Sequence, residues 1–393
     1  MITRQDLPRT SVLVLVLGLV IPVVVLLSLH SKAETVPTFA LTVPPLVPEQ
    51  LLLKSIRLWN SEIVVESEEY EEASERWISQ YQYYAVDSKK GLYPLKIASC
   101  NAIRSIAESA QDVFALCGNG QHPVLLSTAK NTMSGWKTRE LPTGLQVEDN
   151  LLLTAFNSHL ALLSSDYLYW LTSNGGWSKM PFHHPSSVEI KVPPQHLLLT
   201  NRGLFVGYDA GEFGGALIFI PIQPNSPNPL GPSQLLSSMN VNAIVQDRTG
   251  AVWVAGGLAH LGMKRADLVR IKEGTVETIL HEGTFGEKSR TLSGSLQLPE
   301  RTDVSSLCLD PTDKPLILAT HLGVLELDDK SFRYRIKANF SISYKMPDYS
   351  VGSQPVGMLC PVDGRILIAT RSTGIMEFVN SATGYNFRQL VFP

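Results

Sequence analysis

The feature that most constrains this fold is an apolar seven-residue segment that recurs seven times along the chain. Successive segments begin 50, 47, 44, 48, 64 and 50 residues apart. They read EIVVESE from Glu62, DVFALCG from Asp112, HLALLSS from His159, GLFVGYD from Gly203, AVWVAGG from Ala251, PLILATH from Pro315 and RILIATR from Arg365. Self-similarity at such a period is typical of repeat proteins, in which each unit is covered by its neighbours.

The second, third and fourth positions of every segment are apolar. A strand with two apolar faces must be covered on both sides, and a propeller blade obtains that cover from the blades beside it. Residues 51–393 average 49 per unit, and a four-stranded blade needs about 40–50 residues. We therefore predict an all-β protein, a seven-bladed β-propeller of four-stranded blades, preceded by an N-terminal hydrophobic helix.

Flanking strands complete the predicted blades. In the last three units, first strands are predicted at 242–248, 304–310 and 356–361, each ending in an Asp- or Gly-bearing turn. Third strands are predicted at 267–271, 324–327 and 374–378. Tryptophan marks the fourth strand of three early units, at Trp77, Trp136 and Trp177.

Two regions fit the repeat less well. Glu62 to Tyr84 contains seven glutamates by Glu75, a pattern that also suits an amphipathic helix. We predict a blade there, because Trp59-Asn60-Ser61 and Trp77 align with Phe156-Asn157-Ser158 and Trp177. The 64-residue interval predicts an insertion at 281–301, which we expect to be a surface loop.

The N-terminus predicts export. Arg4 and Arg9 precede an uncharged run at 11–29, which is long enough to span a bilayer as a helix. Ser31 and Ala33 then place small residues at a potential cleavage site. Residues 1–33 are therefore either a cleaved signal peptide or a membrane anchor, and 34–50 form a proline-rich linker. The propeller is expected to be periplasmic or extracellular, or anchored in the cytoplasmic membrane with the propeller outside.

The four cysteines, Cys100, Cys117, Cys308 and Cys360, form no CxxC pair, which excludes zinc ribbons and thioredoxin-like sites. Cys100 and Cys117 flank one predicted hairpin and are near enough to be joined. Separate buried thiols are nevertheless the favoured interpretation for all four.

Composition restricts the partners. The formal net charge of -3 shows no basic excess, which argues against nucleic acid. A mildly acidic chain also suits anionic lipid poorly, so membrane contact is expected only through 11–29. The expected partner is a protein or a small-molecule ligand at one face of the propeller.

The sequence contains no nucleophile elbow, P-loop, dinucleotide fingerprint or HExxH helix. Gly211 to Gly215 is predicted to be a hairpin loop rather than a phosphate cradle. Neighbouring residues on a strand point to opposite faces, so His183 and His184 are not expected to share a metal ion.

Carboxylates supply the remaining candidates. The glutamate run of the first unit is expected to be a solvated face, as most such runs are. Binding of calcium or of a basic partner is the alternative. Asp209 and Glu212 follow a core strand and could face the mouth of the propeller, but a solvated loop is the favoured interpretation. The run comprises Glu66, Glu68, Glu69, Glu71, Glu72 and Glu75.

The fifth unit, VNAIVQDRTGAVWVAGGLAHLGMKRAD, resembles the propeller repeat of bacterial two-component-regulator sensors. The shared elements are an apolar strand, Asp247-x-x-Gly250, Val252-Trp253-Val254 and a glycine-bearing return to Arg265. The resemblance implies a seven-bladed propeller outside the membrane that senses a ligand. The chain has no kinase or DNA-binding region, so the resemblance implies the fold rather than a signalling output.

We therefore predict an exported, non-catalytic propeller that binds a ligand or protein, or serves as a scaffold, in the cell envelope. A propeller hydrolase, lyase or lactonase with a site in the central channel is one alternative. An extracytoplasmic sensor subunit of a signalling system is the other. No catalytic, cofactor-binding or metal-ligating residue is assigned, and no cofactor is predicted.

Overall fold

The structure, a computed structural model, describes residues 38–42 and most of 51–390. The longest gaps within that range are 184–191, 224–229 and 344–354. The signal peptide or anchor predicted at 1–33 lies outside the described residues. Within the described residues, no helix is long and apolar enough to cross a membrane.

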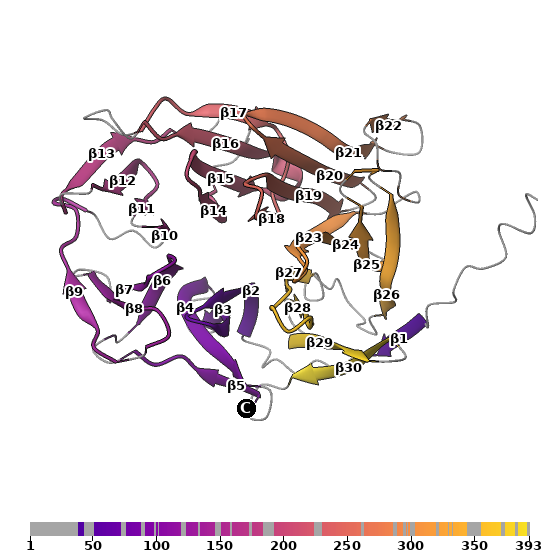
Figure 1. The fold of residues 1–393 in the computed structure, drawn as a ribbon, viewed down its shortest axis with the longest axis horizontal. Helices are drawn as coiled ribbons and strands as arrows, with labels where there is room; N and C mark the ends of the chain where they lie inside the picture. Colours follow the sequence, from indigo (N-terminus) through magenta and orange to yellow (C-terminus); the bar gives the residue numbers. More distant parts are fainter. Residues whose placement is uncertain are drawn as a thin grey trace, which may run out of the picture. The chain divides into compact units, whose positions relative to one another are not determined.

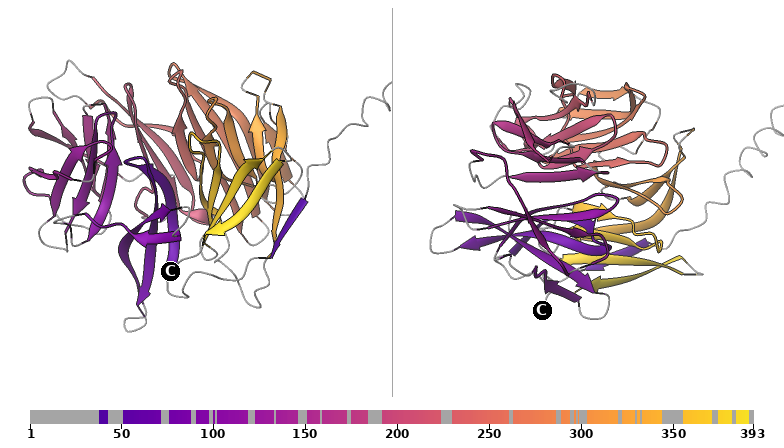
Figure 2. Two further views of the ribbon diagram at one scale, coloured as in Figure 1. Left: turned by 60° about the horizontal axis from the view of Figure 1, so that its bottom comes forward. Right: turned by 60° about the vertical axis from the view of Figure 1, so that its left-hand side comes forward.

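The unit Thr38–Pro393 is a ring of seven sheets, as the spacing of the apolar segments predicts (Figure 1). Each sheet begins with an antiparallel meander of four strands from one continuous stretch of chain. Because the connections are short, the hydrogen bonds within each blade join residues that are close in the sequence. The views in Figure 2 show the sheets standing side by side with their faces toward one another.

The blades are named 1–7 in chain order, and their strands are given from the axis outward. Blade 1 has β2 (Leu51–Trp59), β3 (Glu62–Glu71), β4 (Arg76–Asp87) and β5 (Gly91–Pro94). Blade 2 has β6 (Ile103–Glu108), β7 (Asp112–Cys117), β8 (Val124–Ala129) and β9 (Lys137–Arg139). Blade 3 has β10 (Leu152–Phe156), β11 (His159–Leu163), β12 (Tyr167–Leu171) and β13 (Trp177–Pro181).

Blades 4 and 5 follow the same order. Blade 4 has β14 (His196–Leu199), β15 (Gly203–Asp209), β16 (Gly215–Pro221) and β17 (Gln234–Ser237). Blade 5 has β18 (Ala243–Gln246), β19 (Val252–His260), β20 (Met263–Lys272), β21 (Thr275–Phe285) and β22 (Ser289–Ser293).

Blades 6 and 7 complete the ring. Blade 6 has β23 (Val304–Leu309), β24 (Pro315–Ala319), β25 (Gly323–Leu327), β26 (Tyr334–Ser343) and, at its outer edge, β1 (Thr38–Thr42). Blade 7 has β27 (Pro355–Leu359), β28 (Ile366–Thr370), β29 (Gly374–Ser381) and β30 (Gly384–Leu390).

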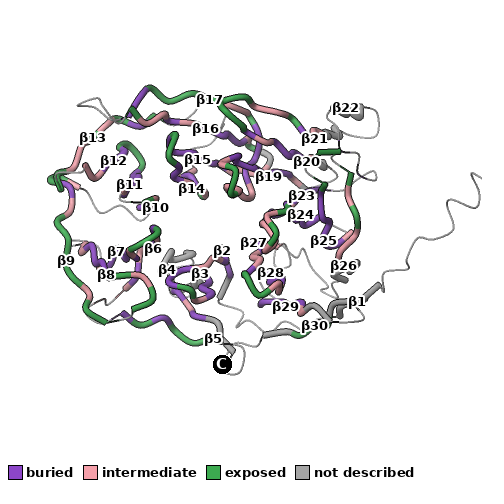
Figure 3. Tube along the Cα trace, viewed as in Figure 1, coloured by how far each residue is buried: buried purple, intermediate pink, exposed green. Residues whose placement is uncertain are grey.

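The seven apolar segments form the second strand of every blade, which confirms the strand assignment. These strands are largely buried, whereas β9 at an outer edge is exposed (Figure 3). Gly256, the sixth residue of the blade-5 segment, is confined by the connection between β17 and β18, because an added Cβ would lie 1.9 Å from the backbone oxygen of Asn240. The close approach of this connection to β19 therefore requires a minimal side chain at that point.

The first unit is a blade and not a helix, because β3 and β4 pair across the glutamate-rich stretch. The alignment of its turn is also correct, since Asn60 and Asn157 both have φ 52°. The prediction for Trp77 was wrong, because Trp77 lies on the third strand, β4. Trp177 begins the fourth strand of its blade as predicted, and Trp136 directly precedes β9.

The insertion is not simply a surface loop. Its first half extends β21 to Phe285 and adds β22 as a fifth strand to blade 5. Leu296 and Leu298 then pack into the core between blades 5 and 6. Part of the predicted linker is likewise a strand, since β1 pairs in parallel with β26.

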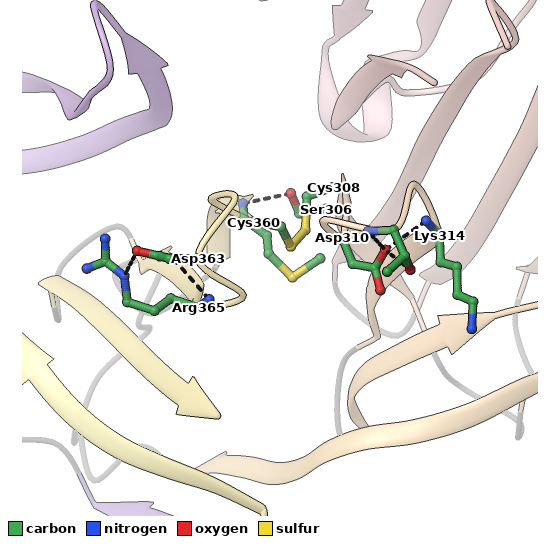
Figure 4. Close-up of a disulfide and its surroundings, with 9 residues drawn as sticks. Ser306, Cys308, Asp310, Lys314, Cys360, Asp363 and Arg365 are labelled. Atoms are coloured by element: carbon green, nitrogen blue, oxygen red, sulfur yellow. Dashed lines mark hydrogen bonds and ion pairs between the residues drawn. A yellow bond between two sulfur atoms is a disulfide. The ribbon is translucent and has the colours of Figure 1, made fainter. Parts of the chain in front are cut away.

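The prediction of separate thiols was wrong, because the cysteines form two disulfides. Cys100 and Cys117 join within blade 2, with their Cα atoms 5.4 Å apart. Cys308 on β23 joins Cys360 just after β27, with a Cα–Cα distance of 5.8 Å, and so links the innermost strands of blades 6 and 7 (Figure 4). The second pair joins consecutive repeats, so its partners become neighbours when blades 6 and 7 pack together.

Loop length predicts the relative contribution of the two disulfides. They close loops with sequence separations of 52 and 17 residues, so chain entropy gives about 4 kcal/mol for the longer and about 3 kcal/mol for the shorter. We expect Cys308→Ser/Cys360→Ser to lose more unfolding free energy than Cys100→Ser/Cys117→Ser in equilibrium urea titrations. Equal stability of the first variant and the unaltered protein would contradict the link between blades 6 and 7.

Candidate functional site

The innermost strands of four blades share a β-bulge. In blade 1 the register shifts after the third residue of the innermost strand. In blades 2, 6 and 7 it shifts after the first residue. A bulge inserts one residue that has no partner on the facing strand and turns its side chain relative to the ladder. The inserted residues are Lys54, Arg104, Ser305 and Val356.

The residue after the bulge joins neighbouring blades in blades 2 and 6. The hydroxyl of Ser105 accepts a hydrogen bond from the backbone N–H of Leu153 in blade 3, at 2.9 Å. The hydroxyl of Ser306 accepts one from Met358 in blade 7, also at 2.9 Å. Both serines are buried, so each satisfies a backbone donor that water does not reach.

Ser55 follows the bulge of blade 1 and makes different contacts. Its hydroxyl donates to Glu66 Oε2 at 2.9 Å. Arg57 Nη2 donates to the same carboxylate oxygen at 2.8 Å and to the Ser55 hydroxyl at 3.3 Å. We call Ser55, Arg57 and Glu66 the blade-1 triad.

The other three bulged blades have no charged group at the positions of Arg57 and Glu66. Arg57 lies two residues after Ser55, the residue that follows the bulge. The same position in blades 2, 6 and 7 holds Ala107, Cys308 and Leu359. Glu66 lies on the second strand, opposite Ser55. The facing position in blades 2, 6 and 7 holds Leu116, Leu318 and Ala369. The ion pair is therefore a departure from the repeat and not a requirement of the bulge.

The triad faces blade 2. Arg57 lies opposite Val64, which packs in the cluster shared by blades 1 and 2. The alternate residue Ile56 packs against blade 7. In the triad, the side chain of Glu66 is 12% exposed and that of Arg57 is 37% exposed, so the carboxylate is buried beneath the guanidinium.

Charge on the seven innermost strands is confined to blades 1 and 2. Their sequences contain Lys54, Arg57, Arg104 and Glu108 as the charged residues. Glu108 accepts from Lys130 Nζ at 2.9 Å and from the backbone N–H of Asn60 at 2.6 Å, close to the β2–β3 turn. Lys54 is exposed, and Arg104 Nε donates to the Gly118 carbonyl at 3.0 Å.

The charge of Arg57 affects the pKa of His196, the first residue of β14. Burial lowers the pKa of His196 to about 4, and the positive charge of Arg57 lowers it further in the same direction. The imidazole is therefore neutral near neutral pH. Sequence patterns did not mark His196, because a lone histidine at the start of an apolar strand is more often part of a core.

The carboxylates singled out from the sequence lie in different places. Asp209 is partly buried at the end of β15, where burial raises its pKa and the backbone N–H of Gly211 opposes the rise. Its Oδ1 accepts from Gly211 N at 2.9 Å, so it stabilises the turn and is not a solvated loop residue. Residues Gly211–Phe213 form a short 3-10 turn between β15 and β16, as a hairpin loop should. The side chain of Glu212 is outside the described residues.

Of the glutamate run, only the side chain of Glu66 is within the described residues. Glu66 belongs to the triad, so the expectation of a solvated face was wrong for this residue. The side chains of the other five glutamates lie outside the described residues. His183 is exposed, and His184 lies in a gap. No group of three potential metal ligands was found among the described residues.

Buried carboxylates recur on the third strands of blades 5, 6 and 7. Asp267 binds His281 Nδ1 at 2.6 Å and Arg265 Nε at 2.7 Å. Glu326 binds Arg335 and Lys337, each at 2.7 Å. Glu377 binds Arg365, which directly precedes β28, and Arg388 on β30. Because the arrangement repeats from blade to blade, we interpret the Asp–His pair as structural.

The serine that follows the bulge binds the next blade in blades 2 and 6 and binds Glu66 in blade 1, and mutation can separate these two roles. Ser105→Ala and Ser306→Ala leave a buried backbone N–H without an acceptor, which is expected to cost about 1–3 kcal/mol of unfolding free energy each. Ser55→Ala leaves no backbone donor unsatisfied and is expected to cost less. Urea titrations of the three variants measure the difference, and a Ser55→Ala loss equal to the other two would contradict the assignment.

His196 is expected to make stability depend on pH. In the unfolded chain an ordinary histidine binds a proton near pH 6.5, whereas the folded protein resists protonation until about pH 4. The contribution of neutral His196 is therefore complete above pH 6.5 and is lost as pH falls toward 4. His196→Gln should show a smaller loss of stability across this window in urea titrations. Parallel pH profiles would contradict the pKa.

No protein-family description and no curated protein sequence matches the chain. Among solved structures, it resembles the extracellular domain of a putative hybrid two component system from B. thetaiotaomicron, with 12% identity and a TM-score of 0.47 over 88% of this chain and 40% of that one. A second such domain from B. thetaiotaomicron has 13% identity and a TM-score of 0.43 over 86% and 42% of the two chains. The structure of YCF48 bound to D1 peptide has 10% identity and a TM-score of 0.46 over 88% and 98%. The chain thus spans less than half the length of the two extracellular domains, and at these identities the likeness is one of fold.

Proposed function

We propose that this chain is an exported, non-catalytic propeller that binds a ligand or a protein in the cell envelope. Two disulfides support export, because such bonds persist in oxidising compartments and are rare in a reducing cytosol. The apolar run at 11–29 would carry the chain across the membrane, either as a cleaved signal or as an anchor.

The observation that carries binding is the blade-1 triad. Six core strands have an apolar or glycine residue where β3 has Glu66. Ser55 and Arg57 lie on the innermost strand β2, and the innermost strands of the seven blades converge at the centre of the ring (Figure 1). Polar groups held on a rigid scaffold can fix a ligand with little loss of entropy.

A sensor role is a second candidate, favoured by the turn of blade 5. Asp247 Oδ1 accepts from the backbone N–H of Thr249 and of Ala251, both at 2.9 Å. Asp247 Oδ2 accepts from Trp253 Nε1 at 3.0 Å. These contacts explain why the Asp-x-x-Gly…Trp pattern of the sensor-type repeat forms a stable unit. An uncleaved segment at 11–29 would then hold the propeller at the membrane beside a separate kinase.

Fractionation of a bacterium that expresses the full chain tests export. We expect the protein in the periplasmic, secreted or membrane fraction, with its four cysteines labelled by maleimide only after reduction. A variant that lacks residues 1–33 should stay in the cytosol and be labelled without reduction. A full-length protein found in the cytosol with reduced cysteines would contradict the proposal.

Ligand binding is tested by thermal unfolding of the purified protein against small molecules of positive, zero and negative charge. A ligand at one hundred times its Kd adds about 2.7 kcal/mol to the unfolding free energy, which raises the Tm by several degrees. The same panel on a protein with the ion pair removed identifies binding at the triad. Failure of the panel and of envelope proteins to bind would contradict a binding role.

A further inference from the structure

We propose that the junction between blades 4 and 5 binds a calcium ion, with Asp209, the side chain of Asn240 and the carbonyl of Met239 as its protein ligands. The site lies where β15 ends and where the chain approaches β18. It is separate from the blade-1 triad and goes beyond the proposed binding function. A buried oxygen without a donor, a carboxylate without a cation and a glycine that leaves room between them support the proposal.

Asn240 supplies the buried oxygen. It lies in the connection between β17 and β18, and its side chain is 4% exposed. Its Nδ2 donates to the carbonyl of Gly211 at 2.7 Å, which fixes the orientation of the amide. Its Oδ1 is buried and has no hydrogen-bond donor among the described residues. Because buried polar atoms are nearly always paired, such an oxygen indicates a missing partner, which in proteins is a water or an ion.

Asp209 points toward the same junction. It lies four residues after Phe205 on β15, so the two side chains share one face of the strand, and Phe205 packs in the core between blades 4 and 5. The N–H of Gly211 donates to Oδ1, whereas no hydrogen bond or ion pair from the described residues reaches Oδ2. Burial raises the pKa of Asp209, and no basic side chain among the described residues opposes that rise. The carboxylate therefore lacks a counter-ion.

Gly215 allows these oxygens to converge. It is the direct partner of Asp209 in the pairing of β15 with β16, and opposed residues of an antiparallel pair place their side chains on one face. A Cβ at Gly215 would lie 2.4 Å from Asn240 Oδ1 and 2.4 Å from the Met239 carbonyl oxygen. The two oxygens therefore meet on the face toward which Asp209 points, in a space that any larger residue would fill.

The three oxygens match the ligand preference of calcium. Calcium binds carboxylate, amide and main-chain carbonyl oxygens and completes its shell with water, so it does not need a cluster of acidic or histidine side chains. Its contacts with oxygen, at about 2.3–2.6 Å, are shorter than the hydrogen bonds of water. A bare ion can therefore approach the buried Oδ1 of Asn240 more closely than water can. Magnesium fits less well, because it requires near-ideal octahedral geometry and retains its waters.

One carboxylate predicts a weak site. Calcium affinity rises with the number of charged ligands, and extracellular modules bind calcium with a Kd of about 0.1–1 mM. A site with Asp209 as its one charged ligand among the described residues belongs in that range. Calcium would neutralise the carboxylate and occupy the free oxygen of Asn240, so it should stabilise the junction between blades 4 and 5.

Asp209→Asn is the principal test variant. It removes the charge but keeps an oxygen that can accept from the N–H of Gly211, so this protein should fold. Asn240→Ala removes the amide oxygen. Asp166→Asn is the matched control, because Asp166 is exposed and lies in the β11–β12 turn, the counterpart in blade 3 of the turn after Asp209.

Calorimetric titration of the full chain with calcium chloride, after removal of metals with a chelator, provides the measurement. We expect one calcium ion per protein with a Kd of about 0.1–1 mM, and a Tm that is several degrees higher in about 10 mM calcium than in chelator. Asp209→Asn and Asn240→Ala should each weaken binding at least tenfold and lose the rise in Tm. Asp166→Asn should bind like the unaltered protein.

Three outcomes would overturn the calcium site: no calcium binding, binding retained by Asp209→Asn, or an equal rise in Tm with magnesium. An Asp209→Asn protein that is more stable than the unaltered one, with no effect of calcium on either, would show that Asp209 is only a tolerated buried charge. Each of these results would leave the proposed function intact, because ligand binding at the triad is measured separately.

Discussion

The structure depends on the packing of each blade against the two beside it. The second strands are apolar on both faces, and seven such strands are covered only when the ring closes. Among the described residues, blades 7 and 1 are joined by side-chain packing. Leu53 and Ile56 of blade 1 and Leu367 and Ile375 of blade 7 form that contact. The Cys308–Cys360 disulfide reinforces the neighbouring junction.

This dependence explains which parts of the fold could be predicted from the sequence. Burial on both faces leaves a dense local pattern, so the second strand of every blade was found, down to the aligned turns at Asn60 and Asn157. The glutamates of β3 obscured the pattern, since a dense run of charged residues also suits the solvated face of an amphipathic helix.

Features that depend on contacts between distant residues escaped prediction. The partners Cys308 and Cys360 are one repeat apart, and nothing local distinguishes a buried thiol from a bonded one. The bulge at Lys54 is a property of strand register, and it decides which face Arg57 and Glu66 occupy. The insertion between blades 5 and 6 contains polar residues because β22 lies at an outer edge, where a strand needs little apolar character. The alignment of repeats could have marked Glu66 as the one charged residue at its position in the second strand. Only the folded structure shows that Arg57 is its partner.

The bulged blades provide an internal comparison for the site. They share a backbone arrangement, and two of them use the serine after the bulge to bind the next blade. Blade 1 uses that serine to hold Glu66 and Arg57 instead, although Leu359 and Ala369 show that apolar residues satisfy the same backbone. A buried ion pair seldom stabilises a fold more than the apolar pair it replaces. The requirements of packing would therefore be met without the triad, and this departure from the repeat is what the proposed binding role has to explain.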